Sequence, residues 1–140
     1  MASLNHIGIA INNLPLMTKL FGLLNLKIDH SEAVPTESVM THFLPLPLHG
    51  LENSFNLEFL EPLDPEKGPI ANFLKKKGPG IHHLAFSVNP GELELLSERL
   101  RKEGFRLIYD KAQPGAHGAK VNFIHPAFAG GILIELMEPR

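Results

Sequence analysis

Residues 5–12 read NHIGIAIN, and residues 82–89 read HHLAFSVN, the same pattern 77 positions later. Residues 57–62, LEFLEP, return with the same offset as IELMEP at residues 134–139. Two motifs that share one offset are the mark of an internal duplication, in which each copy is one supersecondary unit. The sequence therefore predicts a structure built from two similar modules.

Each copy carries one histidine and one glutamate at matching places. His6 corresponds to His83 and Glu58 to Glu135, so that the histidine and the glutamate lie 52 positions apart in both copies. Imidazole nitrogen and carboxylate oxygen together suit Co²⁺, Ni²⁺, Mn²⁺, Fe²⁺ or Zn²⁺. We predict a metal site shared by the two modules, with these four side chains as its ligands.

The composition limits the class of protein. The chain has 140 residues, of which 44% are hydrophobic, a net charge of −2 and no cysteine. It is long enough for one domain with a buried core, and it lacks the basic runs that nucleic acids or anionic membranes attract. No apolar stretch approaches the length of a membrane span, and the N-terminus has no signal-peptide pattern. We expect a soluble, cytoplasmic protein without a nucleic-acid or membrane partner.

Hydrophobic periodicity predicts one order of elements in both copies, a strand, a helix and then three strands. The elements expected in the first copy are strands over residues 4–12, 26–30, 39–46 and 55–61 and a helix over residues 14–24, with Asn13 as its cap and a turn at Pro45, Pro47 and Gly50. Those expected in the second copy are strands over residues 81–89, 105–109, 120–125 and 131–138, a helix over residues 90–103 that ends at Gly104, and a loop over residues 113–118.

This order implies an α+β fold of two paired βαβββ modules, with a concave sheet in each module and its helix on the convex side. We expect one domain over residues 1–140, made of repeat halves 1–63 and 81–140. Residues 64–80 form the connector, with a short helix ended by Gly78.

Strand alternation places the two histidines on the less bulky faces of their strands. His6 shares its face with Gly8 and Ala10. His83 shares its face with Ala85 and Ser87, whereas His82 points to the helix side. Small neighbours leave room for a ligand. Four protein ligands leave two open positions in an octahedron, so that a substrate with two oxygens could bind the metal and lose a proton to a nearby carboxylate.

The chain resembles the vicinal oxygen chelate superfamily and, within it, the methylmalonyl-CoA epimerase family. The resemblance rests on the following stretches: HIGIAI, LEFLEPLDP, GPIANFLKKKGPGIHHLAF, PGAHGAKVNFIHP and GGILIELMEP. It implies a concave mixed sheet around a metal site with ligands His6, Glu58, His83 and Glu135, a divalent ion (Co, Ni, Mn or Zn), an acyl-CoA substrate and a homodimer. Epimerases often have glutamine where Glu58 stands, and some carry a proposed catalytic glutamate where this chain has Thr41.

The resemblance implies epimerisation of (R)- and (S)-methylmalonyl-CoA through a metal-stabilised enolate. Glu135 and Glu58 are the carboxylates nearest the expected metal, so either is a candidate for the base. Two alternatives remain at this point. One is glyoxalase I, which acts on a glutathione hemithioacetal with the same kind of metal set. The other is a non-catalytic member of the superfamily that binds a small molecule. Lys75, Lys76, Lys77 and Lys120 are candidates for contact with CoA phosphates, although a basic run is more often a solvated face.

Overall fold

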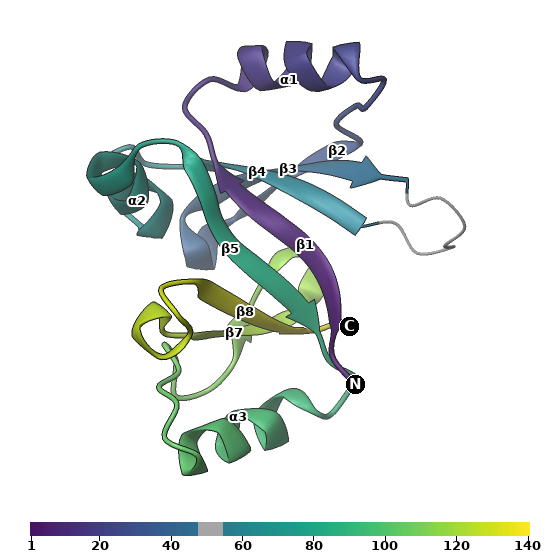
Figure 1. Cartoon of the computed structure of the whole chain (residues 1–140). Helices are drawn as coiled ribbons and strands as arrows, with labels where there is room; N and C mark the ends of the chain where they lie inside the picture. The colour runs from purple at the N-terminus through teal and green to yellow at the C-terminus, as the bar shows by residue number, and fades with distance from the viewer. Residues whose placement is uncertain (48–54) are drawn as a thin grey trace. The chain divides into compact units, whose positions relative to one another are not determined.

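A computed structural model describes residues 1–47 and 55–140 of the chain (Figure 1). Gly50 of the expected turn and His49 lie outside these residues. The chain forms two compact units, one of residues 6–82 and one of residues 1–5 with 83–140. The division into repeat halves at residues 63 and 81 stays a prediction.

The unit of residues 6–82 contains a four-stranded sheet in the order β2-β3-β4-β1. Its elements are β1 (Ser3–Ala10, of which the part from His6 onward belongs to this unit), α1 (Leu14–Leu23), β2 (His30–Val34), a 3₁₀ turn (Pro35–Glu37), β3 (Val39–Leu46), β4 (Phe55–Pro62) and α2 (Pro69–Lys77). β1 and β4 are parallel, and the other pairs are antiparallel.

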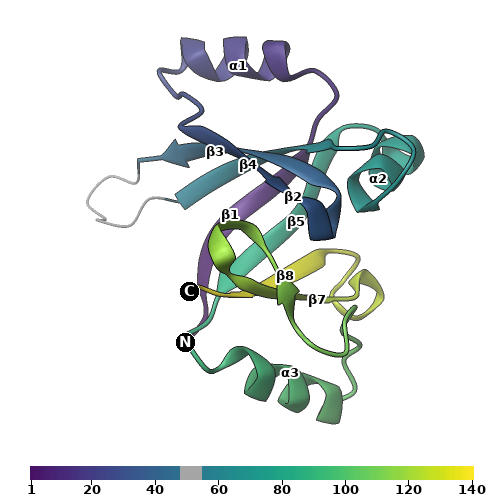
Figure 2. The same ribbon diagram turned by 180° about the vertical axis from the view of Figure 1, so that it is seen from behind.

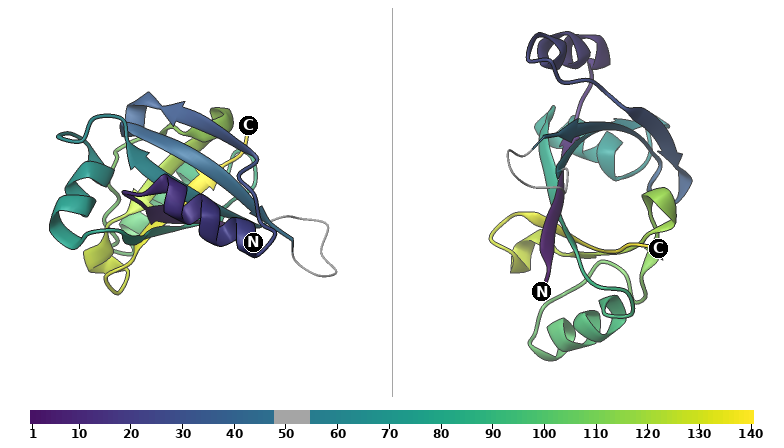
Figure 3. Two further views of the ribbon diagram at one scale, coloured as in Figure 1. Left: turned by 90° about the horizontal axis from the view of Figure 1, so that it is seen from above. Right: turned by 90° about the vertical axis from the view of Figure 1, so that its right-hand side faces the viewer.

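Asn13 caps the start of helix α1, and its side-chain oxygen accepts a hydrogen bond from the Leu16 backbone N–H at 3.0 Å. This is the expected cap. The helix covers one face of the sheet (Figure 3), and the core between them is built on buried Ile11, Leu44 and Phe59. Ile9 of β1 and Ile11, which follows the strand, belong to this core, so the helix packs on the face opposite His6.

The other unit repeats this plan with the sheet order β5-β8-β7-β6. Its elements are β5 (Gly80–Ser87, from His83 onward in this unit), α3 (Leu93–Lys102), β6 (Gln113–Pro114), a 3₁₀ turn (Ala116–Gly118), β7 (Lys120–Ile124), a second 3₁₀ turn (Pro126–Phe128) and β8 (Leu133–Glu138). Helix α3 lies beside β7 and β8 (Figure 2), over a core of Val88, Leu93 and Leu136. The predicted α+β class and the order of elements in each module are confirmed.

Both predicted helix ends after the first module are also confirmed. Helix α2 stops at Gly78, with φ of +74°, and α3 is followed by Gly104, with φ of +91°. Residues with a Cβ rarely adopt this left-handed conformation, so glycine ends each helix at little cost.

The strand expected over residues 26–30 is wrong, since β2 begins only at His30. The alternating Leu26 and Ile28 that suggested it pack instead into the core beneath α1. Residues 30–34 pair with β3 instead, and Ser31 lies opposite His42. An alternating apolar pattern reports a buried face, and here that face belongs to an irregular segment.

The strand expected over residues 105–109 is also wrong. Only an isolated bridge joins Leu107 to Ile124, because the Asn122 side chain takes the backbone groups of Tyr109 that a longer ladder would need. Its Oδ1 accepts from the Tyr109 N–H at 3.2 Å, and its amide donates to the Tyr109 carbonyl at 3.0 Å. The first strand after α3 is instead the two-residue β6, inside the segment expected to be a loop.

Glu138 at the end of β8 caps helix α3. Its Oε2 accepts a hydrogen bond from the Leu93 N–H at 3.1 Å. The hydrogen bond from Leu93 lowers the pKa of Glu138 below its ordinary value of 4.5. A second backbone hydrogen bond, from Gly91, and the positive charge of Lys120 lower this pKa further, whereas burial raises it. Because the folded-state pKa is lowered, the stabilisation is present above pH 4.5 and is lost as the pH falls through the folded-state value.

Glu138→Gln is therefore expected to lower the free energy of unfolding by about 1 kcal/mol near neutral pH. Urea denaturation at pH 7 and at successively lower pH checks this, with Glu98→Gln on the exposed side of α3 as the control. The difference from the unchanged protein should shrink below pH 4.5. A difference that is the same at every pH would show that the loss comes from packing and not from charge.

Candidate functional site

The unit of residues 6–82 brings His6 and Glu58 together. In the parallel pair of β1 and β4, Gly8 lies opposite Glu58, so the histidine is two residues before the position that faces the glutamate. His6 Nδ1 lies 3.2 Å from Glu58 Oε1. Both residues are buried, with exposed fractions of 4% and 7%. This is the first of the two predicted histidine–glutamate pairs.

The unit that contains residues 83–140 brings His83 and Glu135 together in the same way. In the parallel pair of β5 and β8, Ala85 lies opposite Glu135, again two residues after the histidine. His83 Nε2 lies 3.0 Å from Glu135 Oε2, and both residues are buried. The sequence duplication is thus a duplication of strand register, with a small residue opposite each carboxylate.

Each pair lies on the sheet face that points away from its helix. Leu57 and Phe59, which flank Glu58, pack with α1. Ile134 and Leu136, which flank Glu135, pack with α3. Because successive side chains of a strand point to opposite faces, both glutamates leave the helix side, as the sequence predicts.

A buried carboxylate is costly unless a charge or hydrogen-bond donor compensates it. Here an imidazole lies within ion-pair distance of each glutamate, so the two protect one another from the cost of burial. A divalent cation could be coordinated by the same carboxylate oxygens and the same ring nitrogens. Nitrogen and oxygen donors of this kind fit a first-row divalent ion, so the residues present suit the implied metal.

The other histidines have different surroundings. His42 is buried on the α1 side of β3, where its Nδ1 lies 2.6 Å from the Ser31 hydroxyl and its Nε2 lies 2.7 Å from Glu61 Oε2. His82 packs edge-on against Phe73 of the connector helix α2. No local pattern around His42 indicates these hydrogen-bond contacts, because its two partners come from the neighbouring strands.

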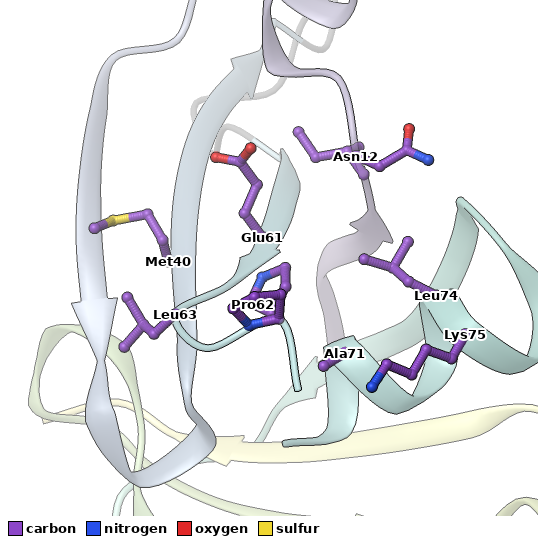
Figure 4. A pocket seen from close by; sticks show the side chains of 10 residues that line it. Asn12, Met40, Glu61, Pro62, Leu63, Ala71, Leu74 and Lys75 are labelled. Atoms are coloured by element: carbon purple, nitrogen blue, oxygen red, sulfur yellow. The ribbon is translucent and has the colours of Figure 1, made fainter. Parts of the chain in front are cut away.

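The unit of residues 6–82 also has an open pocket of about 650 Å³. It is mostly apolar, with Glu61, Lys75 and Asn12 among its polar side chains (Figure 4). Lys75 is paired with Glu66 at 2.6 Å. His6 and Glu58 are not among the lining residues that the described part of this unit contributes, so the pocket and the histidine–glutamate pair are separate features.

The chain repeats one plan in its two modules, a histidine–glutamate pair on two parallel strands. Residues 5–123 match the model of the glyoxalase/bleomycin resistance protein/dioxygenase superfamily. The chain belongs to this superfamily.

Among its relatives are methylmalonyl-CoA epimerases. The mitochondrial methylmalonyl-CoA epimerase of Dictyostelium discoideum is 37% identical over 96% of this chain and 77% of its own length. The uncharacterised protein YqjC of Bacillus subtilis is 35% identical over the whole chain and 94% of its own length. The resemblance to the epimerase family that the sequence motifs indicate is confirmed.

Solved structures agree. The crystal structure of methylmalonyl-CoA epimerase from Mycobacterium tuberculosis matches with a TM-score of 0.86 and 37% identity, over 98% of this chain and 87% of that one. A methylmalonyl-CoA epimerase in complex with methylmalonyl-CoA and NH₄⁺ matches with a TM-score of 0.87 and 26% identity, over 99% of this chain and 95% of that one. In the described part of the present chain, no helix has the length and hydropathy of a membrane span.

Proposed function

We propose that this protein is a metal-dependent epimerase that interconverts (R)- and (S)-methylmalonyl-CoA. The observation that carries the proposal is the pair of buried His–Glu contacts at equivalent register positions, in a chain whose relatives are methylmalonyl-CoA epimerases. A solved structure of a methylmalonyl-CoA epimerase holds methylmalonyl-CoA, and this supports the same class of substrate here.

We propose that His6, Glu58, His83 and Glu135 hold one divalent ion, with Co, Ni, Mn or Zn as the candidates. The donor chemistry supports the set, and the repeat supports its division between the modules. When bound, the ion supplies a Lewis acid that makes the α-proton of the chelated acyl group more acidic. The chain's own task is then to orient the substrate, keep water away and move the proton.

Proton transfer requires a carboxylate close to the α-carbon, and Glu58 and Glu135 are the proposed candidates. Glutamine can ligate through its carbonyl oxygen but cannot accept a proton at neutral pH. Replacing each glutamate by glutamine therefore separates a ligand from a base. Because the epimerase pattern often has glutamine at the position of Glu58, Glu135 is the stronger candidate for the base.

Glu135→Gln is expected to keep its metal but lose at least about 100-fold in kcat, the range typical of deleting a general base. Glu58→Gln should keep metal and lose less than about tenfold. Metal content by plasma mass spectrometry and epimerisation rates measure the two effects. Equal losses in both variants, together with loss of metal, would leave both glutamates as ligands only.

The proposed function itself is tested by incubating each epimer of methylmalonyl-CoA in D₂O with the purified protein. The expected result is interconversion of the epimers together with solvent deuterium at the α-carbon. Turnover of methylglyoxal and glutathione, with no change in methylmalonyl-CoA, would instead support the glyoxalase alternative. Tight binding of a small molecule without metal or turnover would support a binding protein.

We further propose a cytoplasmic homodimer without a nucleic-acid or membrane partner. The superfamily resemblance supports the dimer, and the net charge of −2 supports the absence of a polyanionic partner. Light scattering after size-exclusion chromatography measures the mass in solution. A mass near the 15.5 kDa of one chain would refute the dimer.

A further inference from the structure

Inversion at the α-carbon needs two proton-transferring groups, one on each face of the planar carbanion. A carboxylate bound to a metal is a weaker base than one outside the ligand set of that metal, because the cation stabilises its charged form. A glutamate that points to the site face but lies outside the proposed ligand set would meet the chemical need better than a second ligand. Glu32 is such a residue.

The strand register places Glu32 on the face of the His6–Glu58 pair. In the antiparallel sheet, Glu32 of β2 lies opposite Thr41 of β3, and the next row on the same face has Phe43 opposite Glu58 of β4. Directly opposite residues of antiparallel strands share a face, with Cβ atoms about 4.5–5.5 Å apart. Glu32, Thr41 and Glu58 therefore point to the same side of the sheet.

Side-chain contacts on both faces agree with this register. On the site face, the ring of His30 stacks on Phe43 with centroids 4.4 Å apart. On the α1 face, Ser31 and His42 are in hydrogen-bond contact. Glu32 follows Ser31 and Thr41 precedes His42, so alternation turns both away from α1.

Thr41 is 3% exposed and has no group that accepts a proton at neutral pH. Glu32 lies in the strand next to Thr41, and its side chain is about as long as the spacing between the two strands. The Glu32 carboxylate can therefore extend over Thr41. Glu32 is half-buried. Among the described residues of β1–β4 in this unit, Glu32 and Glu58 are the carboxylates whose strand positions face this side.

We infer that Glu32 is a catalytic residue that transfers the α-proton on one face of the substrate, an inference that rests on the proposed epimerase function. The α C–H bond of one epimer breaks, its electron pair delocalises into the thioester carbonyl as an enolate, and the proton passes to a carboxylate oxygen of Glu32. The same carbon receives a proton on its other face from the carboxyl group proposed at Glu135. In the reverse direction the two residues exchange roles, so no other reactant is needed.

The decisive variant is Glu32→Gln, which keeps the size of the side chain and removes the base. Epimerisation should fall at least about 100-fold, whereas metal content should stay unchanged and the variant should still unfold cooperatively. Each epimer is then incubated separately in D₂O. The epimer whose proton Glu135 removes should still exchange its α-proton, and the other epimer should not.

Two further variants use the cross-strand position. Thr41→Ala is the matched control in the neighbouring strand and should lose less than about tenfold in kcat. In the double variant Glu32→Gln with Thr41→Glu, the carboxylate returns to the same face from the adjacent strand. The double variant should epimerise at least about tenfold faster than Glu32→Gln.

The outcomes separate this inference from the function on which it rests. If the unchanged protein neither epimerises methylmalonyl-CoA nor exchanges its α-proton, both proposals fail. If the unchanged protein is active and Glu32→Gln keeps at least half of its rate, the role of Glu32 alone is refuted. Equal loss of exchange for both epimers would also refute it, because a residue that only binds substrate or supports the fold affects both faces alike.

Discussion

His83→Ala is expected to lose its stoichiometric metal and at least about 100-fold of epimerase activity. His83 is buried against Glu135, at an Nε2–Oε2 distance of 3.0 Å. Its removal would take away one proposed ligand and the imidazole that contacts the buried Glu135 carboxylate. The metal would then bind less well, and Glu135 would be less well oriented. Plasma mass spectrometry and the epimerase assay measure the two losses.

The adjacent histidine provides a matched control. His82 faces the other side of β5 and packs on Phe73, so His82→Ala should keep its metal and remain within a few-fold of the normal rate. Full activity of His83→Ala would refute the metal site. Equal loss of metal in both variants would show that the strand itself, and not the imidazole, had been disturbed.

The second large effect is expected from Ala85→Leu, which should lower kcat/KM at least about tenfold while metal stays bound. Ala85 lies opposite Glu135 in the parallel pair, as Gly8 lies opposite Glu58. If small residues at these positions leave space for the acyl group, a leucine at residue 85 occupies that space. It should then raise KM more than it lowers kcat. Gly8→Val should act in the same direction in the other module.

Ala85 is fully buried, so packing must be measured beside activity. Overpacking a close-packed core costs about 1–3 kcal/mol of stability. Ala33→Leu, at an exposed position of the edge strand β2, controls for the larger side chain in a strand. A loss of stability without any change in kcat/KM would show that Ala85 is core and does not line a substrate site.

Much of the fold could be read from local patterns. The alternation of His6, Gly8 and Ala10 predicted which face of β1 carries the histidine, and Asn13 and Gly78 predicted helix ends. The repeated motifs predicted the two histidine–glutamate pairs. These features are encoded within a few residues of the chain, through a period of two in strands and through the backbone and side-chain chemistry of helix ends.

Long-range pairing decided what local pattern could not. Leu26 and Ile28 alternate as a strand does, yet they fill the core under α1, while the less apolar residues 30–34 form β2. Tyr109 lies in a strand-like run, yet the Asn122 side chain takes its backbone hydrogen bonds. A periodic pattern states that one face is buried, but not which partner buries it.

By itself, therefore, the sequence determined the duplicated plan, the order of elements and the identity of the two histidine–glutamate pairs. Tertiary structure decided the cross-strand neighbours, which set Glu32 opposite Thr41 and His42 between Ser31 and Glu61. The physical reason is that a strand's side chains alternate according to its own sequence, whereas its register depends on the competing strands that pair with it.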